Sequence, residues 1–457
     1  MSNSQSTVVL RPRRLTLVSV FVGAAMILAG CETVTDLFPG RSSNKTILPG
    51  ERISVLSLEQ QLEADPRIAD LQVRLPQPYV NAEWPQPGGY SSHAMHHLAL
   101  GDAPRRLWRT RIGTGSGGNT RLTATPVVAD GRVFALDARA RAAAFDAETG
   151  ARLWRVELTP RKQRAQTGFG GGVAYESGRV FVSTGFGRIH ALDAATGEEL
   201  WVKKFAVPFR ASPTADGGRV FVATTDNQLQ VLAQSDGRVL WDHQGISETA
   251  GLLGSASPAI SGEIAIVPYT SGEIYALRVQ NGQTAWTDSL TRTGNLTALT
   301  ALNDIAGRPV IDRGRVVAIS HSGRMVSIDA RTGQRVWTRD IGGVQTPWVA
   351  GDFIFVVTLE SQVLCISRRD GRIRWITELP RYRNEKKKKE PIEWAGPVLA
   401  GDRLIVLSSD GYAVSISPYV GGVTGGITIP TGTFIPPVVA NGTLYILTDK
   451  ADLIAMR

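Results

Sequence analysis

The chain has 457 residues, of which 42% are hydrophobic and 20% charged, and this composition excludes a disordered polypeptide. Only two cysteines are present, which excludes a disulfide framework and a cysteine-rich metal site. The net charge of +9 is modest for this length and does not by itself imply nucleic-acid binding, so we predict no nucleic-acid partner.

The first thirty residues have the pattern of an export signal. An arginine-rich stretch, 11–14, precedes the uncharged apolar run 15–28, which is shorter than the ~20 residues needed to span a bilayer. The run is followed by Ala-Gly and Cys31, and this ending resembles the lipobox of bacterial lipoproteins. The resemblance implies removal of residues 1–30 as a signal peptide and lipidation of Cys31. Because Glu32 rather than Asp follows, it also implies sorting to the periplasmic face of the outer membrane.

Residues 31–103 form a second region, which we interpret as a lipidated tether with a short N-terminal segment that packs on the main domain. One helix is expected over residues 58–71. His93, His96 and His97 cluster before the first repeat, at a spacing for which a metal or haem site is conceivable. We favour a partly buried segment packed against the next domain, and we predict no metal and no cofactor.

From Trp108 onward one pattern recurs, in which β runs are followed by a glycine turn and then by a Trp. Residues 178–184 and 187–193 are two such runs, rich in β-branched and apolar residues. Each Trp lies four residues after its glycine. Four strands in about 45 residues correspond to one blade of a β-propeller. The glycine–tryptophan pairs are Gly150/Trp154, Gly197/Trp201, Gly237/Trp241, Gly282/Trp286, Gly333/Trp337 and Gly371/Trp375.

We count eight units by their opening segments, over residues 104–457. The seventh lacks its Trp, and residues 420–425 occupy that place. The eighth has only three strands, whereas residues 106–110 form an unpaired Trp strand before the first unit. Pairing that strand with the last three would close the ring and remove the free edges. The predicted fold is all-β: an eight-bladed β-propeller of four-stranded antiparallel blades, the last closed by an N-terminal strand.

The Ala-Leu-Asp, Thr-Gly and Trp signature of residues 191–201 resembles the pyrroloquinoline-quinone (PQQ) type of propeller repeat. A propeller of this kind behind a lipobox resembles the BamB-type lipoproteins of the outer-membrane β-barrel assembly machinery. That resemblance implies a scaffold that docks on the periplasmic POTRA domains of the barrel insertase BamA and supports outer-membrane protein folding and insertion. It further implies repeat tryptophans that dock between blades. Unfolded outer-membrane proteins are further expected partners, through β-augmentation.

Two loops resemble the contact region of that family. Phe209 and Arg210 precede a Ser-Pro-Thr segment, and Asp304 lies in a Leu-Asn-Asp-Ile segment. The resemblance implies that these three residues contact the insertase, and that Ala306 replaces a second Asp and removes one polar contact. An exposed aromatic–arginine pair on a rim loop is typical of a binding hot spot. A Phe209 that plugs the propeller and an Asp304 that caps a loop are the alternatives.

A PQQ-binding, quinoprotein-like enzyme is the first alternative function. Such enzymes need acid and amide ligands for Ca²⁺ and often a disulfide of adjacent cysteines. This sequence offers isolated acid–amide pairs, such as Asp226-Asn227, and a lone Cys365 in an apolar strand-like run. We therefore predict no enzymatic activity. The second alternative is a periplasmic interaction propeller with another partner.

One strong charge run, Lys386, Lys387, Lys388 and Lys389, lies between the sixth Trp and the seventh unit. Its position predicts a loop. It is either a solvated insertion or a basic contact loop for an anionic lipid surface or an acidic partner.

Overall fold

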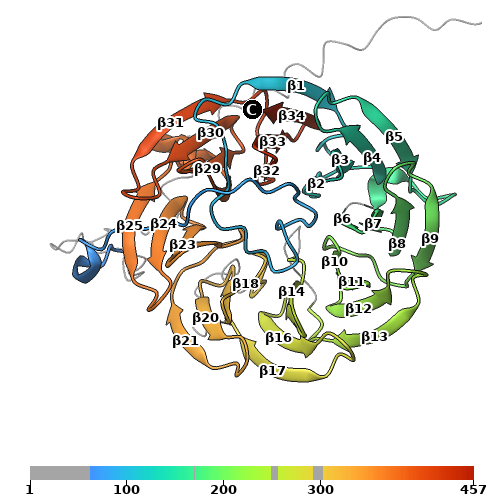
Figure 1. Cartoon of the computed structure of the whole chain (residues 1–457), viewed down its shortest axis with the longest axis horizontal. Helices are drawn as coiled ribbons and strands as arrows, with labels where there is room; N and C mark the ends of the chain where they lie inside the picture. The colour runs from blue at the N-terminus through green and yellow to red at the C-terminus, as the bar shows by residue number, and fades with distance from the viewer. Residues whose placement is uncertain (1–61, 169, 249–255, 292–301) are drawn as a thin grey trace, which may run out of the picture. The chain divides into compact units, whose positions relative to one another are not determined.

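The computed structural model describes residues 62–168, 170–248, 256–291 and 302–457; the predicted signal peptide and Cys31 lie outside these ranges. In the described part, eight four-stranded sheets are arranged around a central axis like the blades of a propeller (Figure 1). The predicted all-β, eight-bladed architecture is confirmed. No helix in the described ranges is both long and apolar enough to cross a membrane.

The strands of each blade are named a to d from the axis to the rim. Blades 1 to 4 consist of β2 (Val127–Ala129), β3 (Arg132–Leu136), β4 (Arg141–Asp146) and β5 (Arg152–Glu157); β6 (Gly171–Glu176), β7 (Arg179–Thr184), β8 (Arg188–Asp193) and β9 (Glu199–Lys204); β10 (Thr214–Asp216), β11 (Arg219–Ala223), β12 (Gln228–Ala233) and β13 (Val239–Gln244); and β14 (Ala259–Ser261), β15 (Ile264–Pro268), β16 (Glu273–Arg278) and β17 (Thr284–Ser289).

The remaining blades follow the same order, except that the last takes its outer strand from the start of the propeller. Blades 5 to 8 consist of β18 (Val310–Asp312), β19 (Arg315–Ile319), β20 (Met325–Asp329) and β21 (Arg335–Arg339); β22 (Trp348–Ala350), β23 (Phe353–Val357), β24 (Gln362–Ser367) and β25 (Ile373–Glu378); β28 (Trp394–Ala400), β29 (Arg403–Ser408), β30 (Tyr412–Ile416) and β31 (Val423–Thr428); and β32 (Val438–Ala440), β33 (Thr443–Leu447), β34 (Asp452–Met456) and β1 (Arg106–Arg111).

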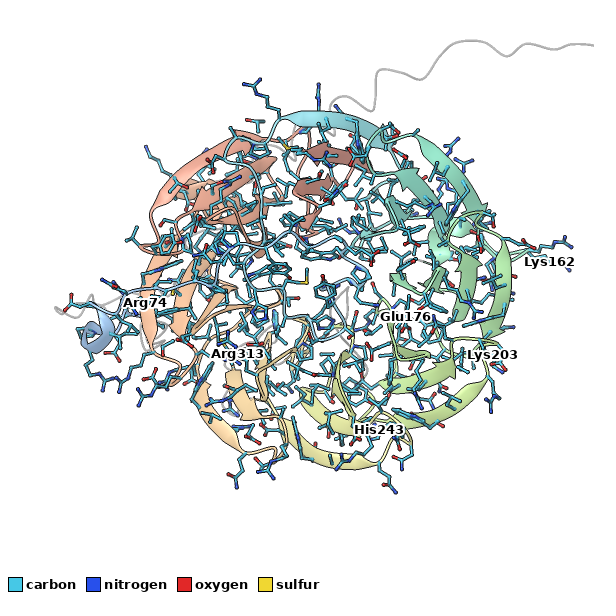
Figure 2. All side chains as sticks on the ribbon, in the orientation of Figure 1. Arg74, Lys162, Glu176, Lys203, His243 and Arg313 are labelled. Atoms are coloured by element: carbon cyan, nitrogen blue, oxygen red, sulfur yellow. The ribbon has the colours of Figure 1, made fainter. Side chains whose placement is uncertain are left out.

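Most b and c strands are buried on both faces because each blade packs between two neighbours; β30 of blade 7 is the most exposed of them. In β3 and β7 every residue after the first is buried, which accounts for their consecutive apolar residues. The outer strands differ: in β5 only Trp154 is buried, and Arg152, Arg155 and Glu157 of the same strand are exposed. Figure 2 shows such a side chain, Lys203 of β9, at the rim of the disc.

Each repeat tryptophan packs on the glycine turn of the next blade, as expected. A Cβ atom at Gly197 would lie 2.7 Å from the Trp154 ring, and Gly197 has a φ of +76°, so only glycine suits the position. The indole N–H of Trp154 donates to the carbonyl of Ala194 in the same turn, at 3.0 Å. The arrangement recurs for Trp108, Trp201, Trp241, Trp286, Trp337 and Trp375 on Gly150, Gly237, Gly282, Gly333, Gly371 and Gly421.

The ring closes as predicted. Strand β1 pairs antiparallel with β34, with Trp108 opposite Ala455. Backbone hydrogen bonds between Arg105 and Arg457, of 2.7 and 2.9 Å, continue the pairing beyond the strands. The closure explains the missing seventh Trp, because strands c and d of blade 8 come from opposite ends of the propeller and no glycine turn joins them. A Trp in β31 would have nothing to cover, and Gly425 stands there.

The N-terminal helix expected over residues 58–71 is wrong in its described part. Only a single 3₁₀ turn, η2 (Pro66–Ile68), forms there, and Asp65 caps it by accepting a hydrogen bond from the Arg67 N–H. Pro66 suits the first turn of a helix, and the chain downstream carries no apolar stripe to hold a longer one. A second short 3₁₀ turn, η3 (Ala165–Thr167), precedes blade 2.

An extended segment, residues 79–98, crosses the middle of the disc (Figure 1) and is here called the inner strap. It contacts the innermost strand of every blade. Hydrogen bonds join Trp84 to Val128 in blade 1, Pro85 and Gln86 to Tyr175 in blade 2, Gln86 to Ala215 in blade 3, and Ser91 to Ile260 in blade 4. Further hydrogen bonds join Ser92 to Ile311 in blade 5, His96 to Trp348 in blade 6, Leu98 to Leu399 in blade 7, and Asn81 to Val439 and Asn441 in blade 8.

The three clustered histidines serve this packing, as favoured above. His93 is buried, and its Nδ1 donates to the Pro309 carbonyl at 2.7 Å. Burial lowers the pKa of His93 to about 3, so the ring is neutral at neutral pH. His97 is also buried and has partners at both ring nitrogens, the Pro76 carbonyl and the Asp402 N–H. His96 lies 3.5 Å from an Asp312 carboxylate oxygen.

Candidate functional site

The strand order gives the disc two faces. Because the strands of each blade are consecutive and antiparallel, the d–a links and the b–c loops lie on one face, here called the link face. The a–b and c–d turns lie on the other, the strap face. The inner strap bonds to the ends of a strands next to their a–b turns, as at Ile260 and Asn441, so it covers the strap face of the axis.

The link face brings two of the sequence-predicted residues together. Arg210 lies on the link from blade 2 to blade 3, and Asp304 on the link from blade 4 to blade 5. Arg210 Nη1 is 3.8 Å from Asp304 Oδ2, although the residues are 94 positions apart. The Asp304 side chain is 1% exposed and that of Arg210 19% exposed. The arginine is therefore the member of the pair that reaches the surface, and the carboxylate orients it from below.

Phe209 is not exposed, so the expectation of an exposed aromatic–arginine pair is wrong. Its side chain is 1% exposed and packs with Ile189, Val222 and Leu232. It meets Phe205 edge to face, with ring centroids 5.3 Å apart. Phe209 anchors the link to blades 2 and 3, and in this way it fixes the position of Arg210. The link is short, and its apolar side chains gain more by filling the space between blades than by facing water.

An exposed apolar residue lies on the link between those two, and the sequence analysis missed it. Ile246 is on the link leaving blade 3, and its side chain is 58% exposed. Its carbonyl accepts a hydrogen bond from Asn227 Nδ2 at 2.6 Å, and its N–H donates to Glu273 at 3.1 Å. Arg210, Ile246 and Asp304 thus stand on three successive links, and we call them the link-face patch.

A repeat comparison could have found Ile246. In seven of the eight blades an apolar residue turns inward and fastens the link, four residues after the repeat Trp or, in blade 7, after Gly425. At the corresponding place after Trp241 the chain has Gly245, where a Cβ would lie 2.7 Å from the Tyr269 ring. Because Tyr269 fills the anchor position, the next residue faces solvent. The anchors of the other links are Ile112, Leu158, Phe205, Leu290, Ile341, Leu379 and Ile429.

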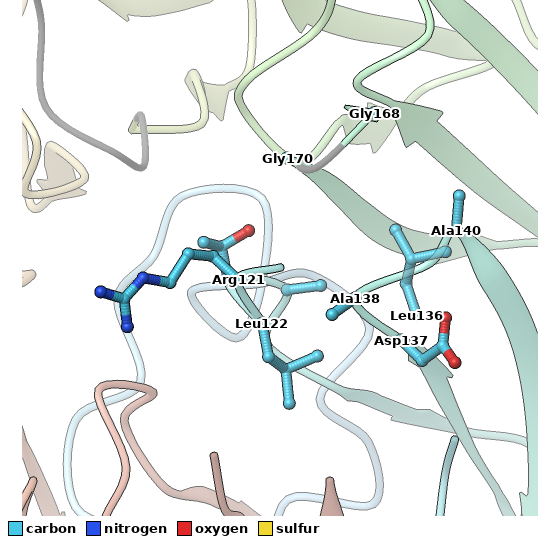
Figure 3. Close-up of a pocket in the computed structure, with 10 residues that line it drawn as sticks. Arg121, Leu122, Leu136, Asp137, Ala138, Ala140, Gly168 and Gly170 are labelled. Atoms are coloured by element: carbon cyan, nitrogen blue, oxygen red, sulfur yellow. The ribbon is translucent and has the colours of Figure 1, made fainter. Parts of the chain in front are cut away.

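A hollow of about 450 Å³ opens on the link face where blades 7, 8 and 1 meet the axis. Burial raises the pKa of Asp449 in its wall to about 6, although Arg121 opposes this shift. A neighbouring cleft that shares Arg121 measures about 10 Å³, room for one water, and in Figure 3 the Arg121 side chain extends away from Leu136 and Asp137. The hollow is lined by Ser116, Gly117, Gly118, Arg121, Thr431, Gly432, Asp449 and Lys450.

The acid–amide pair Asp226-Asn227, considered above as a possible Ca²⁺ ligand set, forms hydrogen bonds within the protein instead. The Asn227 Oδ1 accepts hydrogen bonds from the N–H and hydroxyl of Thr270, at 3.2 and 3.0 Å. Asp226 accepts from the Thr224 hydroxyl. Cys365 is buried, and burial raises the pKa of its thiol. Within the described ranges no group of three or more His, Cys, Asp or Glu side chains is placed to hold a metal ion.

The lysine run is a structured hairpin, so the expectation of a loop is wrong. Strands β26 (Tyr382–Asn384) and β27 (Lys389–Pro391) pair around a 3₁₀ turn, η4 (Glu385–Lys387). The Asn384 side chain caps this turn, and Glu385 accepts the N–H of Arg381 at 2.8 Å. Local capping of this kind orders a segment that charge alone would keep extended. All four lysines are exposed. Residues 381–391 are here called the basic hairpin.

The chain matches known proteins over most of the propeller. The sequence profile of the family described as outer membrane protein assembly factor BamB matches residues 138–377. The outer membrane protein assembly factor BamB of Alkalilimnicola ehrlichii is 30% identical over 358 residues, covering 78% of this chain and 89% of that protein.

Solved structures show the same fold. The crystal structure of BamB from Moraxella catarrhalis superposes with a TM-score of 0.66 at 19% identity, over 78% of this chain and 100% of that one. Quinohemoprotein alcohol dehydrogenase from Comamonas testosteroni gives a TM-score of 0.62 at 14% identity, over 82% and 80%. The structural likeness alone does not separate the two, but the sequence profile does. The chain belongs to the outer membrane protein assembly factor BamB family.

Proposed function

We propose that this protein is a non-catalytic scaffold of the outer-membrane β-barrel assembly machinery and acts in outer-membrane protein assembly. It is anchored at the periplasmic face of the outer membrane through lipidated Cys31. Residues 1–30 are the signal peptide, residues 31–103 the tether with its N-terminal segment, and residues 104–457 the propeller. The assembly role is supported by the relatives named as BamB.

The link-face patch is the proposed docking site for a POTRA domain of the insertase. The observation that carries this proposal is the Arg210–Asp304 pair, which joins the two loops that resemble the family's contact region. Arg210 offers N–H donors to the partner, and the carboxylate behind it fixes the guanidinium. Ile246 adds an apolar contact between the two links. Phe209 supports the site from inside rather than touching the partner.

The role of each residue follows from its burial. The half-buried Arg210 guanidinium beside a buried carboxylate is already partly desolvated, so its desolvation on binding costs less than it would for a fully exposed arginine. Ala306 leaves the second loop with one polar contact fewer than its relatives have, by the resemblance described above. The exposed Ile246 compensates with apolar area. No catalytic residue and no cofactor form part of this proposal.

The proposal is tested by titrating the chain without its signal peptide and lipid-bearing cysteine, residues 32–457, with the POTRA fragment of the same organism's insertase. We expect saturable binding that weakens about tenfold or more in Arg210→Glu and in Ile246→Asp. The matched control is Arg278→Glu, an equally drastic charge reversal at an exposed arginine of β16, which should bind like the native protein. Absence of binding by the native chain would contradict the docking proposal and make a PQQ titration the next experiment.

A further inference from the structure

The outer strand of blade 7 differs from those of all other blades. Seven outer strands carry at least one charged side chain, which discourages another strand from pairing with the open edge. Strand β31, with the sequence Val-Thr-Gly-Gly-Ile-Thr, carries none. The charged residues on the other outer strands are Arg106, Arg109 and Arg111; Arg152, Arg155 and Glu157; Glu199, Lys203 and Lys204; Asp242; Asp288; Arg335 and Arg339; and Arg374 and Glu378.

Strand β31 is also the most open of these edges. All six of its residues are exposed, whereas each other outer strand has at least one buried or half-buried residue. It stands last in its sheet, so its outer backbone groups have no strand partner within the described part of the chain. A Cβ at Gly425 would meet nothing within 4 Å. The strand thus presents unpaired N–H and C=O groups without steric cover.

Apolar side chains flank this edge. Val423 is 59% exposed and Ile427 40%, and Val420 in the preceding turn is 71% exposed. Tyr412, which pairs with Thr428 across β30 and β31, is 51% exposed. A strand added here would therefore gain apolar contacts in addition to backbone hydrogen bonds.

The basic hairpin lies at the end of the same blade. Arg383 forms an ion pair with Asp410, two residues before the start of β30, and the Ser409 N–H donates to the carbonyl of Glu393. Because Tyr412 opposes Thr428, this end of β30 is also the C-terminal end of β31. Four lysines and two arginines against two glutamates make the hairpin strongly positive. The edge is thus neutral along its length and basic beyond one end.

We propose that β31 is a strand-addition site for an extended segment with alternating apolar residues and acidic residues at one end. Alternation with a period of two is the pattern of membrane-spanning β-strands, so an unfolded outer-membrane protein is the partner that fits. The identification of that client rests on the proposed assembly role. The acidic end is selected by charge complementarity with the basic hairpin. The charged side chains on the outer strands of the other seven blades disfavour pairing with such a segment, whereas β31 has no charged side chain to oppose it.

The experiment measures binding of a fluorescent peptide of about ten residues, the length of one membrane strand, to residues 32–457. The peptide alternates Val or Tyr with Thr and ends in three Asp. We expect Gly425→Lys, which fits without strain, to weaken binding about tenfold or more. Val202→Lys on the already charged strand β9 is the matched control and should leave affinity unchanged. Replacing Lys386–Lys389 with Ser should weaken binding at low salt and remove most of its salt dependence.

Two further peptides separate strand addition from other binding. A peptide N-methylated at every residue loses all its backbone donors and should not bind, whereas a form ending in three Lys should bind more weakly. Equal binding of the N-methylated peptide, or equal binding by Gly425→Lys, would overturn the proposal. So would a dimer of the native chain that Gly425→Lys dissolves, since the occupant would then be a second copy. Gly425→Lys should still bind the POTRA fragment, so failure here and failure of the docking proposal are distinguishable.

Discussion

The two faces of the disc use their polar side chains in opposite ways. In the inner strap, buried side chains such as Gln86 and His93 bond to backbone groups in the innermost strands or directly beside them. On the link face, Arg210 and Ile246 reach solvent, and Asp304 lies buried beside Arg210. The strap face is therefore a structural closure, in which the fold satisfies the polar groups, whereas the link face retains groups that a partner can use.

Removal of the closing strand should have the largest effect, because it damages both faces at once. Deleting residues 104–112 removes β1 and leaves blade 8 with three strands and an unprotected edge. We expect loss of cooperative thermal unfolding or a large fall in melting temperature. The milder Trp108→Ala should cost about 3–5 kcal/mol. Melting that is unchanged by the deletion would refute the closure.

A substitution that removes hydrogen bonds of the inner strap should lower folding stability without changing the affinity for the POTRA fragment. Gln86 donates to the carbonyls of Tyr175 and Ala215 and accepts the Ala215 N–H, all buried. Gln86→Ala leaves these groups unpaired, which we expect to cost about 3 kcal/mol in chemical denaturation. The folded variant should bind the POTRA fragment normally, since the link face is untouched. Gln362→Ala, which loses only an exposed hydrogen bond to Glu378, is the control.

A lower pH should reduce the folding stability that His93 in the inner strap contributes. The pKa of His93 is about 3 in the fold and 6.5 without it, so only the unfolded chain gains this proton between these values. Stability conferred by neutral His93 is therefore complete above pH 6.5 and is lost as the pH falls toward 3, by up to about 1.4 kcal/mol per pH unit. Denaturation curves at several pH values should show a shallower acid slope for His93→Asn. An identical slope would contradict the assignment.

At Asp449, on the link face, a lower pH should instead increase the contribution to folding stability. The pKa of Asp449 is raised to about 6 from 3.8, so the folded chain retains a proton that the unfolded chain releases. Its contribution to stability is present below pH 3.8 and is lost as the pH rises through 6. We expect Asp449→Asn to raise the melting temperature slightly at pH 7.5 and to leave it unchanged at pH 3.5. Destabilisation at pH 7.5 would show that the carboxylate is paired rather than merely buried.

The repeat made most of the fold predictable. Glycine and Trp at a fixed offset of four residues report one inter-blade contact, so the blade count and the closure by Trp108 could be predicted from the sequence. The inner strap could not, because it has neither helical nor alternating periodicity and is held by single side chains such as Gln86. Tertiary contacts with eight different strands determine its path.

The site was predictable only in part. Resemblance pointed to Arg210 and Asp304, and their separation of 3.8 Å brings the two loops together. The exposure of Phe209 was predicted incorrectly, because a link residue between blades can turn inward as readily as outward, and composition does not distinguish the two. Ile246 depends on a packing exchange with Tyr269, which becomes visible only when the eight anchor positions are compared.

Docking at the link-face patch is tested most directly by hydrogen–deuterium exchange of residues 32–457 with and without the POTRA fragment. Docking on the link-face patch should slow exchange on the link face, in the described parts of the links that carry Arg210, Ile246 and Asp304. Exchange at the strap face and at β31 should be unchanged. Protection confined to the strap face or to the edge of blade 7 would contradict docking at the link-face patch, because the partner would then bind elsewhere on the propeller.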